Sequence, residues 1–325
     1  IGIMEINIIS AETLGTRSLA TFVECKNIKI LIDPGVALGP RFGLMPHEIE
    51  YKELYKARRK IEEISNLADI ICITHYHYDH YTPFWDKIDN LWTFADFESA
   101  KKIYSNKIVF LKDYYNNINH SQRERANEFI PKLKKVAKEI KIADEKEEKF
   151  NSVKLKFSKA VPHGEENTQL GYVIMVIIEE DGEKFIFGSD IEGPMSKTTC
   201  DLIIREKPDT LLLSGPPLYL VGSKVSIENF NKGIENLKIL CKYIPNLIVD
   251  HHLLRSSEAL NYINELKTIA KSYNNKVMLV AEKERKNINM LEAKRRELYK
   301  SIPLSDKFKK WLNNKEGLPI EIDLK

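Results

Sequence analysis

Cysteine is scarce in this sequence and is never paired. Cys25, Cys72, Cys200 and Cys241 stand far apart in a chain of 325 residues, and no Cys-x-x-Cys motif occurs. A disulfide framework or a thiolate metal site needs cysteines at close, repeated spacings. The sequence therefore argues against both, and it fits the reducing conditions of the cytoplasm, where we expect the protein to reside.

Long apolar runs and an excess of one charge are also missing. The longest apolar stretches, such as 70–74 and 172–178, have the length of strands, whereas a membrane helix needs about 20 apolar residues. No signal-peptide pattern is found at the start of the sequence. Lys and Arg number 50 against 47 Asp and Glu, a formal charge of +3. We therefore expect no membrane partner, and the charge gives no reason to expect nucleic acid.

The sequence does hold enough apolar residues, 43% of the chain, for a sizeable core. Runs rich in β-branched residues predict strands at 5–9, 19–25, 28–32, 69–74, 153–160, 171–179 and 184–187. A helical pattern occupies 48–67, and Asp181-Gly182 predicts a hairpin turn between the last two of these strands. Strand and helix patterns then alternate between 211 and 280. The predicted fold class is therefore mixed α/β.

Two segments look like additions to this order. Residues 121–143 predict a long charged helix that contains Pro131, within a helical insertion at about 112–150. The last segment, at about 283–325, predicts a closing helix with a solvated basic face, and Trp311 and Leu312 are its candidate anchors. No internal repeat and no low-complexity linker occurs, so we expect a single domain over 4–325.

The clearest chemical motif is Ile73-Thr74-His75-Tyr76-His77-Tyr78-Asp79-His80, which directly follows a predicted buried strand. Residues two apart on an extended chain point to the same side, so His75, His77 and Asp79 can converge. His80 joins them if a turn begins at Asp79. Imidazole nitrogen and carboxylate oxygen suit Zn²⁺, Fe or Mn. A strand end with ordinary polar histidines is the alternative, but this spacing favours a metal site.

The pattern His-x-His-x-Asp-His after an apolar strand resembles the signature of the metallo-β-lactamase-fold hydrolases. Their remaining motifs, an early Asp-x-Gly, a lone His, an Asp and a last His, have counterparts here in the same order. These are Asp33-Pro34-Gly35, Val161-Pro162-His163-Gly164, Phe187-Gly188-Ser189-Asp190 and Ile248-Val249-Asp250-His251. The resemblance covers the chain from about Asp33 to His251. It implies an αββα sandwich, in which two mixed sheets face each other, helices lie outside and metals bind at one edge.

The resemblance also implies a role for each matching residue. The implied ligands are His75, His77 and His163 for one metal, Asp79, His80 and His251 for a second, and Asp190 as a bridge between them. The cofactors would be two divalent ions, for which we expect Zn, with Mn or Fe as alternatives. Asp33 resembles a carboxylate that orients the loop beneath the metals without binding them.

Three further residues near these motifs have two interpretations each. Of the adjacent pair His251 and His252, only one is expected to face the metals; alignment with the family favours His251, and His252 would contact substrate or support the site. Arg255 suits recognition of a phosphate or carboxylate, or is a surface residue of a helix. Tyr219, in the proline-rich loop 214–220, lines the pocket or merely packs.

Together these motifs predict a metal-dependent hydrolase. A bridging hydroxide would attack an ester, lactone, thioester or phosphodiester, and Asp79 and Asp190 would be the catalytic residues. Segments such as Leu38-Gly39-Pro40-Arg41 and Ser214-Gly215-Pro216-Pro217 resemble a little-characterised archaeal branch of this superfamily. We expect a small-molecule substrate. The sequence does not decide whether the protein forms a homo-oligomer.

Three alternatives remain. One is a nuclease or phosphodiesterase resembling RNase Z relatives, to which the basic segment at 283–325 gives slight support, although its glutamates dilute the charge. Another is an iron-dependent redox enzyme of the same fold. Related di-iron oxygen reductases would carry Glu in place of His77 and a fused flavodoxin domain, and sulfur dioxygenases use fewer ligands for the second metal. The last is a metal-holding scaffold without turnover.

Overall fold

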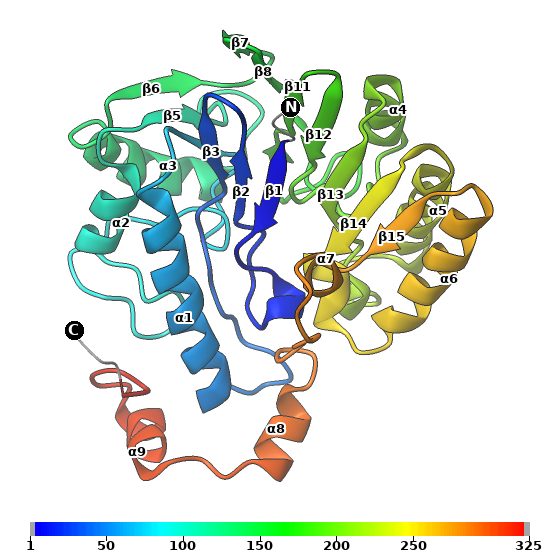
Figure 1. The fold of residues 1–325 in the computed structure, drawn as a ribbon. Coiled ribbons are helices and arrows are strands. Elements are labelled where there is room, and N and C mark those ends of the chain that lie inside the picture. Colours follow the sequence, from blue (N-terminus) through cyan, green and yellow to red (C-terminus); the bar gives the residue numbers. More distant parts are fainter. Residues whose placement is uncertain (1–3, 322–325) are drawn as a thin grey trace.

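The computed structural model describes residues 4–321, and most of its strands belong to two sheets (Figure 1). The first sheet has six strands, in the order β1 (Glu5–Ile8), β2 (Thr21–Glu24), β3 (Lys29–Ile32), β4 (Ile70–Ile73), β5 (Ile108–Leu111) and β6 (Glu139–Ile142). Strands β1 to β3 pair antiparallel, and β3 to β6 pair parallel. The carboxyl ends of β3, β4 and β5 therefore share one edge.

The second sheet has seven strands and is mixed in the same way. Their order is β15 (Lys276–Met278), β14 (Asn246–Asp250), β13 (Thr210–Ser214), β12 (Glu183–Phe187), β11 (Val176–Glu180), β8 (Val153–Phe157) and β7 (Glu147–Phe150). Strands β12 to β15 run parallel, and the others pair antiparallel. A separate short pair, β9 (Val161–Pro162) and β10 (Tyr172–Val173), lies between β8 and β11 in sequence. The turn predicted at Asp181-Gly182 joins β11 to β12, as expected.

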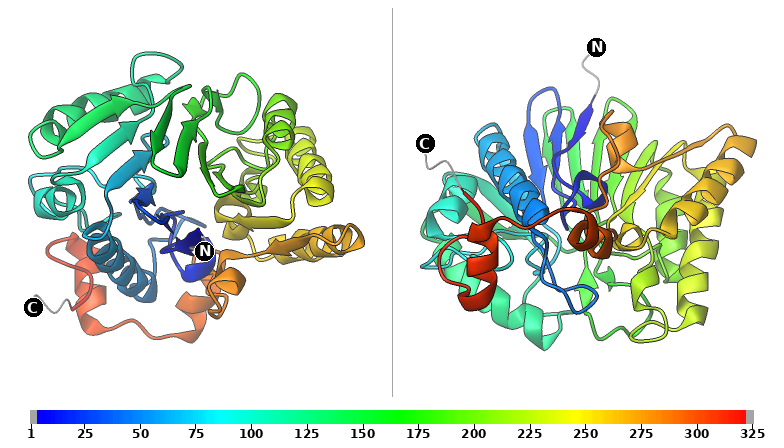
Figure 2. Two further views of the ribbon diagram at one scale, coloured as in Figure 1. Left: turned by 45° about the horizontal axis from the view of Figure 1, so that its top comes forward. Right: turned by 90° about the horizontal axis from the view of Figure 1, so that it is seen from below.

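The helices lie on the outer sides of the two sheets (Figure 2). Beside the first sheet lie α1 (Glu48–Ser65), α2 (Phe97–Tyr104) and α3 (His120–Leu133); beside the second lie α4 (Lys197–Glu206), α5 (Ile227–Tyr243) and α6 (Ala259–Ser272). Short helical turns occur at η1 (Glu12–Leu14), η2 (Leu218–Leu220) and η3 (His251–Arg255). The layer order is αββα, which confirms the predicted fold class.

Alternation along the strands builds these layers. In β4, Ile71 and Ile73 pack toward α1 and α2, whereas Ile70 and Cys72 pack into the core between the sheets. In β13, Leu212 faces that central core, and its two neighbours face α4 and α5. Because successive side chains on a strand point to opposite faces, a strand that is buried on both sides is apolar throughout. This explains the uninterrupted apolar runs of β4 and β13.

The helix predicted over 121–143 is only partly correct. Helix α3 ends at Leu133, with Pro131 inside it as predicted, and the chain then forms β6 and β7. These strands pair with β5 and β8 at the outer edges of the two sheets, so the interval 112–150 is not wholly helical. Edge strands expose one side to solvent and tolerate charged residues. The Lys and Glu residues of β6 and β7, which resembled a helix surface, therefore belong to half-exposed strands.

The C-terminal segment contains three short helices, α7 (Val280–Lys283), α8 (Arg295–Ser301) and α9 (Asp306–Asn314), in place of one closing helix. Trp311 is buried, as the sequence predicts, and its ring lies 5.2 Å from that of Tyr51 on α1. Leu312 packs against the same cluster. Within residues 4–321, no helix is both long and apolar enough to cross a membrane.

Candidate metal centre

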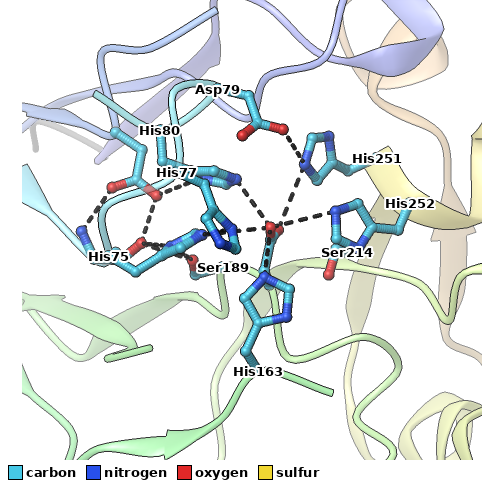
Figure 3. Close-up of polar contacts among 12 residues, drawn as sticks. His75, His77, Asp79, His80, His163, Ser189, Ser214, His251 and His252 are labelled. Atoms are coloured by element: carbon cyan, nitrogen blue, oxygen red, sulfur yellow. Dashed lines mark hydrogen bonds and ion pairs between the residues drawn. The ribbon is translucent and has the colours of Figure 1, made fainter. Parts of the chain in front are cut away.

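Every ligand candidate from the sequence lies just beyond a strand. His75, His77, Asp79 and His80 follow β4; His163 follows β9; Asp190 follows β12; His251 follows β14. Because the two sheets face each other, these strand ends bring the side chains to one place. Figure 3 shows the imidazoles of His75, His77, His163, His251 and His252 pointing toward one another. The structure thus places together all the residues that the sequence predicts as ligands.

Among residues 4–321, four overlapping groups of His and Asp have the composition of a metal site, and two of them match the predicted ligand sets. In one, His75, His77, His163 and Asp190 offer ligand atoms within 4.8 Å of one another; in the other, Asp79, His80 and His251 do so. Asp190 lies between them: its Oδ2 is 3.4 Å from His163 Nε2 and 3.0 Å from His80 Nε2. Its Oδ1 is 3.6 Å from His251 Nε2. A carboxylate in this position can contact two ions at once.

The polar atoms at this point have few protein partners. Both carboxylate oxygens of Asp190, both ring nitrogens of His163 and Nε2 of His80 are buried and form no hydrogen bond with any residue that the structure describes. Buried polar atoms normally have partners, because leaving them unpaired is costly. A cluster of buried imidazole and carboxylate atoms without hydrogen bonds fits divalent metals that prefer nitrogen and oxygen ligands. The residues present therefore fit the predicted metal pair.

Several side chains at the centre have the charge state that metal binding requires. Burial and the neighbouring His80 hold the pKa of His75 well below its usual range, and burial together with His163 lowers the pKa of His77 to about 3. Burial alone would raise the pKa of Asp190, but the surrounding His80 and His252 hold it well below its ordinary value. Neutral imidazoles and an ionised carboxylate are the forms that bind metals.

His80 differs from these histidines. Burial disfavours its charged form, yet the carboxylates of Asp190 and Asp33, one beside each ring nitrogen, raise its pKa to about 10. Without a metal, a proton therefore resides on this imidazole between two acids. A metal that binds His80 must displace that proton, so it takes the place of an existing positive charge.

Asp33 supports the centre without sharing its ligand position. One of its oxygens accepts a hydrogen bond from His80 Nδ1 at 2.7 Å and another from Thr74 Oγ1 at 2.6 Å, and the other accepts from the Thr74 backbone N–H at 2.8 Å. Its carboxylate therefore directs Nε2 of His80 toward Asp190. Gly35 follows it, where a Cβ would lie 2.2 Å from the Tyr81 backbone nitrogen. The Asp-Pro-Gly turn thus lies directly against the histidine turn.

The expectation that only one of His251 and His252 faces the centre is wrong. His252 Nε2 lies 3.4 Å from Asp190 Oδ2, and His251 Nε2 lies 3.4 Å from Asp79 Oδ2. Consecutive side chains point apart on an extended strand, but His251 has φ of 62° and begins the turn η3. That left-handed residue breaks the alternation, and the two rings stack 4.5 Å apart.

Glu192 is a residue of the site that the sequence analysis missed. Its Oε1 lies 2.6 Å from His252 Nδ1 and 3.6 Å from His163 Nδ1, so one buried carboxylate contacts the outer nitrogens of two histidines. Burial raises its pKa to about 7. In the sequence, its position two residues after Asp190 was the signal that could have revealed it. A single Glu in a loop is too common to predict a site residue on its own.

Arg255 lies against the second group of ligands. Its Nη2 is 3.2 Å from Asp79 Oδ2 and 3.2 Å from His251 Nε2, and its Nε donates to Glu12 at 3.1 Å. Nη1 donates to the Tyr219 hydroxyl at 3.0 Å. Arg255 is only 4% exposed. Of the two sequence interpretations, the surface residue is therefore excluded, and Tyr219 belongs to the surroundings of the centre.

Two facing mixed sheets between helical layers, with histidines and aspartates gathered at their strand ends, define this protein as a member of the metallo-β-lactamase fold class. Among solved structures, it is similar to a metal-dependent hydrolase of the β-lactamase superfamily. The TM-score is 0.47 and the identity 13%, over 85% of this chain and 96% of that chain.

Sequence relatives identify the family more closely. The chain is 43% identical over 300 residues to a UPF0282 protein of Sulfurisphaera tokodaii, covering 91% of this chain and 93% of the relative. It is 42% identical over 294 residues to a UPF0282 protein of Thermococcus gammatolerans, covering 90% of this chain and 94% of the relative. The chain therefore belongs to the UPF0282 family, and both of these relatives are archaeal. A comparison with models of protein families gives no match.

Proposed function

We propose that this protein is a metal-dependent hydrolase with a two-metal centre. The observation that carries the proposal is the convergence around Asp190 of buried imidazole and carboxylate atoms that form no hydrogen bond with the described residues. His75, His77 and His163 would hold one divalent ion, and Asp79, His80 and His251 would hold the other, with Asp190 between them. Zn is the expected metal, and Mn or Fe are alternatives.

A divalent pair in such a centre supplies an activated water near neutral pH and compensation for negative charge on a substrate oxygen. The residues of this chain provide the remaining steps. Asp79 and Asp190, both held ionised, accept hydrogen bonds from the attacking water and orient it toward an ester, lactone, thioester or phosphodiester. The pKa of Asp79 stays well below its usual value because His251 and His80 outweigh the effect of its burial.

His252 is the candidate proton donor for the leaving group. Its Nε2 points into the centre, while Glu192 accepts a hydrogen bond from Nδ1 at 2.6 Å. A carboxylate on Nδ1 fixes the ring orientation. Burial holds the pKa of His252 well below its usual range, so Nε2 would first take a proton from the attacking water and then give it to the leaving group. Glu192 therefore acts as a positioning residue for His252. Water exclusion follows from burial, since both side chains are almost fully covered.

The test is a hydrolysis panel on metal-loaded protein, with bis(p-nitrophenyl) phosphate, a lactone and a thioester as substrates. Asp190→Asn should reduce kcat/KM at least ~100-fold on whichever substrate the wild type hydrolyses, since it removes a charged group that contacts both ligand groups. Asp86→Asn is the matched control, because the Asp86 side chain is 89% exposed. Oxygen consumption without hydrolysis, or equal activity in both variants, would contradict the proposal.

A further inference from the structure

We propose that Arg41, Tyr219 and Arg255 form an anion site beside the metal centre, which binds a phosphate or carboxylate group of the substrate. We call these three residues the arginine cluster. This inference rests on the proposed hydrolase function and narrows its substrate class to molecules that carry a negative charge near the bond that is broken.

The arginine cluster is continuous with the metal centre. Arg255 lies 3.2 Å from ligand candidates Asp79 and His251, and its guanidinium carbon is 5.6 Å from the centre of the Tyr219 ring. The guanidinium carbon of Arg41 lies 4.7 Å from the centre of the same ring. Arg41 Nη2 is also 3.4 Å from the backbone oxygen of Arg255. The guanidinium groups of Arg41 and Arg255 thus both lie over the Tyr219 ring, next to the ligand candidates Asp79 and His251.

The loop that carries Arg41 holds the side chain in place. Arg41 and Leu44 exchange backbone hydrogen bonds of 3.3 and 2.9 Å, and Phe42 and Gly43 between them have φ of 57° and 69°. This is a tight turn with two left-handed residues. The Arg41 guanidinium stacks on Phe42 at 4.5 Å as well as on Tyr219. Stacking on two rings limits the directions in which Arg41 can turn.

Charge pairing leaves Arg41 available for a ligand. The neighbouring Arg17 makes two hydrogen bonds to Glu292, of 2.6 and 2.7 Å, and Arg255 pairs with Glu12. Within residues 4–321, Arg41 forms no ion pair, and its buried Nε–H has no hydrogen-bond acceptor. An unpaired buried donor on a cation is the group that an incoming anion would satisfy. Guanidinium groups match phosphate and carboxylate oxygens in shape and charge.

The experiment measures binding of inorganic phosphate and of acetate to metal-loaded protein by isothermal titration calorimetry, with metal content determined on the same samples. Arg41→Met tests the site. Arg296→Met is the matched control, because Arg296 is exposed and stacks on the same Phe42 ring, at 4.3 Å, whereas the cations over the Tyr219 ring within residues 4–321 are Arg41 and Arg255. Neither arginine is a ligand candidate, so metal content should stay unchanged in both variants.

We expect saturable binding of at least one anion by the wild type, weakened at least tenfold in Arg41→Met and less than twofold in Arg296→Met. The anion that binds more tightly identifies the substrate group. No saturable binding, or equal weakening in the two variants, would overturn the anion site. Hydrolysis is scored separately: Arg41-dependent binding by a protein that hydrolyses nothing would support the anion site and reject the hydrolase, and the opposite result would do the reverse.

Discussion

At the level of single residues, neighbouring side chains orient the ligand candidates of the centre. Asp33 fixes one ring nitrogen of His80, Thr74 and Ser189 lie 3.1 and 3.4 Å from Nδ1 of His75, and Glu192 fixes His252. Carboxylates and hydroxyls behind metal-binding histidines set the direction of the free nitrogen. The residues behind the histidines therefore help to determine where each ligand nitrogen points.

Asp33→Ala tests this support at one histidine. Without the carboxylate at 2.7 Å, His80 loses its fixed orientation, so affinity for the second ion should fall roughly 10–100-fold while the first ion stays bound. Competition with a chelator, followed by metal analysis, measures the two affinities. Asp86→Ala, which changes an exposed carboxylate, should leave both unchanged. Equal retention of both ions in Asp33→Ala would contradict the orienting role.

The sequence allowed the ligand candidates to be predicted because their spacing follows from strand geometry and from the family motif. The pairing of His251 with His252 was not predictable in the same way, since it depends on φ of 62° at His251. Glu192 also has a left-handed backbone, with φ of 53°. Backbone turns of this kind are set by long-range packing, so residues placed by them escape pattern analysis.

At the scale of elements, the centre depends on turns that meet at the strand ends. The turn after β3 contacts the turn after β4 so closely that Gly35 has no room for a side chain: an added Cβ would be 2.2 Å from the Tyr81 nitrogen and 2.5 Å from His80 backbone atoms. Backbone atoms cannot move aside as the end of a flexible side chain can. The two turns must therefore fit together before His80 can face Asp190.

Gly35→Ala should destabilise the fold by about 3 kcal/mol, because overpacking against backbone forces a shift of both turns. Gly182→Ala is the control: its φ is 88°, but nothing lies within 4 Å of the added atom. Its cost should be about 1 kcal/mol, from the left-handed backbone alone. Urea denaturation of both variants gives the comparison. A smaller loss for Gly35→Ala than for Gly182→Ala would show that the turns do not meet as described.

The elements themselves were predictable where both faces of a strand are buried, as in β4, or where an amphipathic helix is long, as in α1. The secondary-structure prediction was wrong at the edge strands of the two sheets. Residues 139–150 carry so many charges that they resembled a helix, but β6 and β7 are edge strands whose outer sides face solvent. Charge periodicity in a short edge strand does not reveal its partner, because the pairing is made with residues distant in sequence.

At the level of the whole molecule, two ion pairs, one of them fully buried, join the N-terminal and C-terminal parts of the chain. Arg17 contacts Glu292 at 2.6 Å, and Arg295 contacts Glu50 at 2.7 Å, with both members of the second pair buried. The central core also contains side chains from both sheets. We propose on these grounds that the described residues 4–321 fold as a single domain, which a single cooperative unfolding transition would support; the last four residues of the predicted range lie outside the described residues.

The Arg17–Glu292 pair makes stability depend on pH. Burial alone would raise the pKa of Glu292, but Arg17 lowers it below its ordinary value of 4.5. A lowered folded-state pKa means that this contribution is present above pH 4.5 and is lost as the pH falls further. Glu292→Gln leaves the partly buried guanidinium of Arg17, whose side chain is 18% exposed, without its partner, and should cost about 3 kcal/mol at pH 7.

Unfolding free energies measured between pH 7 and pH 3 by urea titration check this prediction. The difference between wild type and Glu292→Gln should shrink at the acid end, because the wild-type carboxylate is then protonated. Glu228→Gln is the control, since its partner Lys232 is on the exposed surface of the same helix. A constant difference over the whole range would show that the ion pair does not set the dependence.

We propose that two metal ions are held by seven residues, His75, His77, His163, Asp79, His80, His251 and Asp190. Elemental analysis of the purified protein by plasma mass spectrometry, after dialysis, tests it most directly. We expect close to two equivalents of Zn or Mn in the wild type and in Asp86→Ala, and clear loss of metal in Asp190→Ala. A protein without stoichiometric metal, or one with a single iron and oxygen consumption, would contradict it.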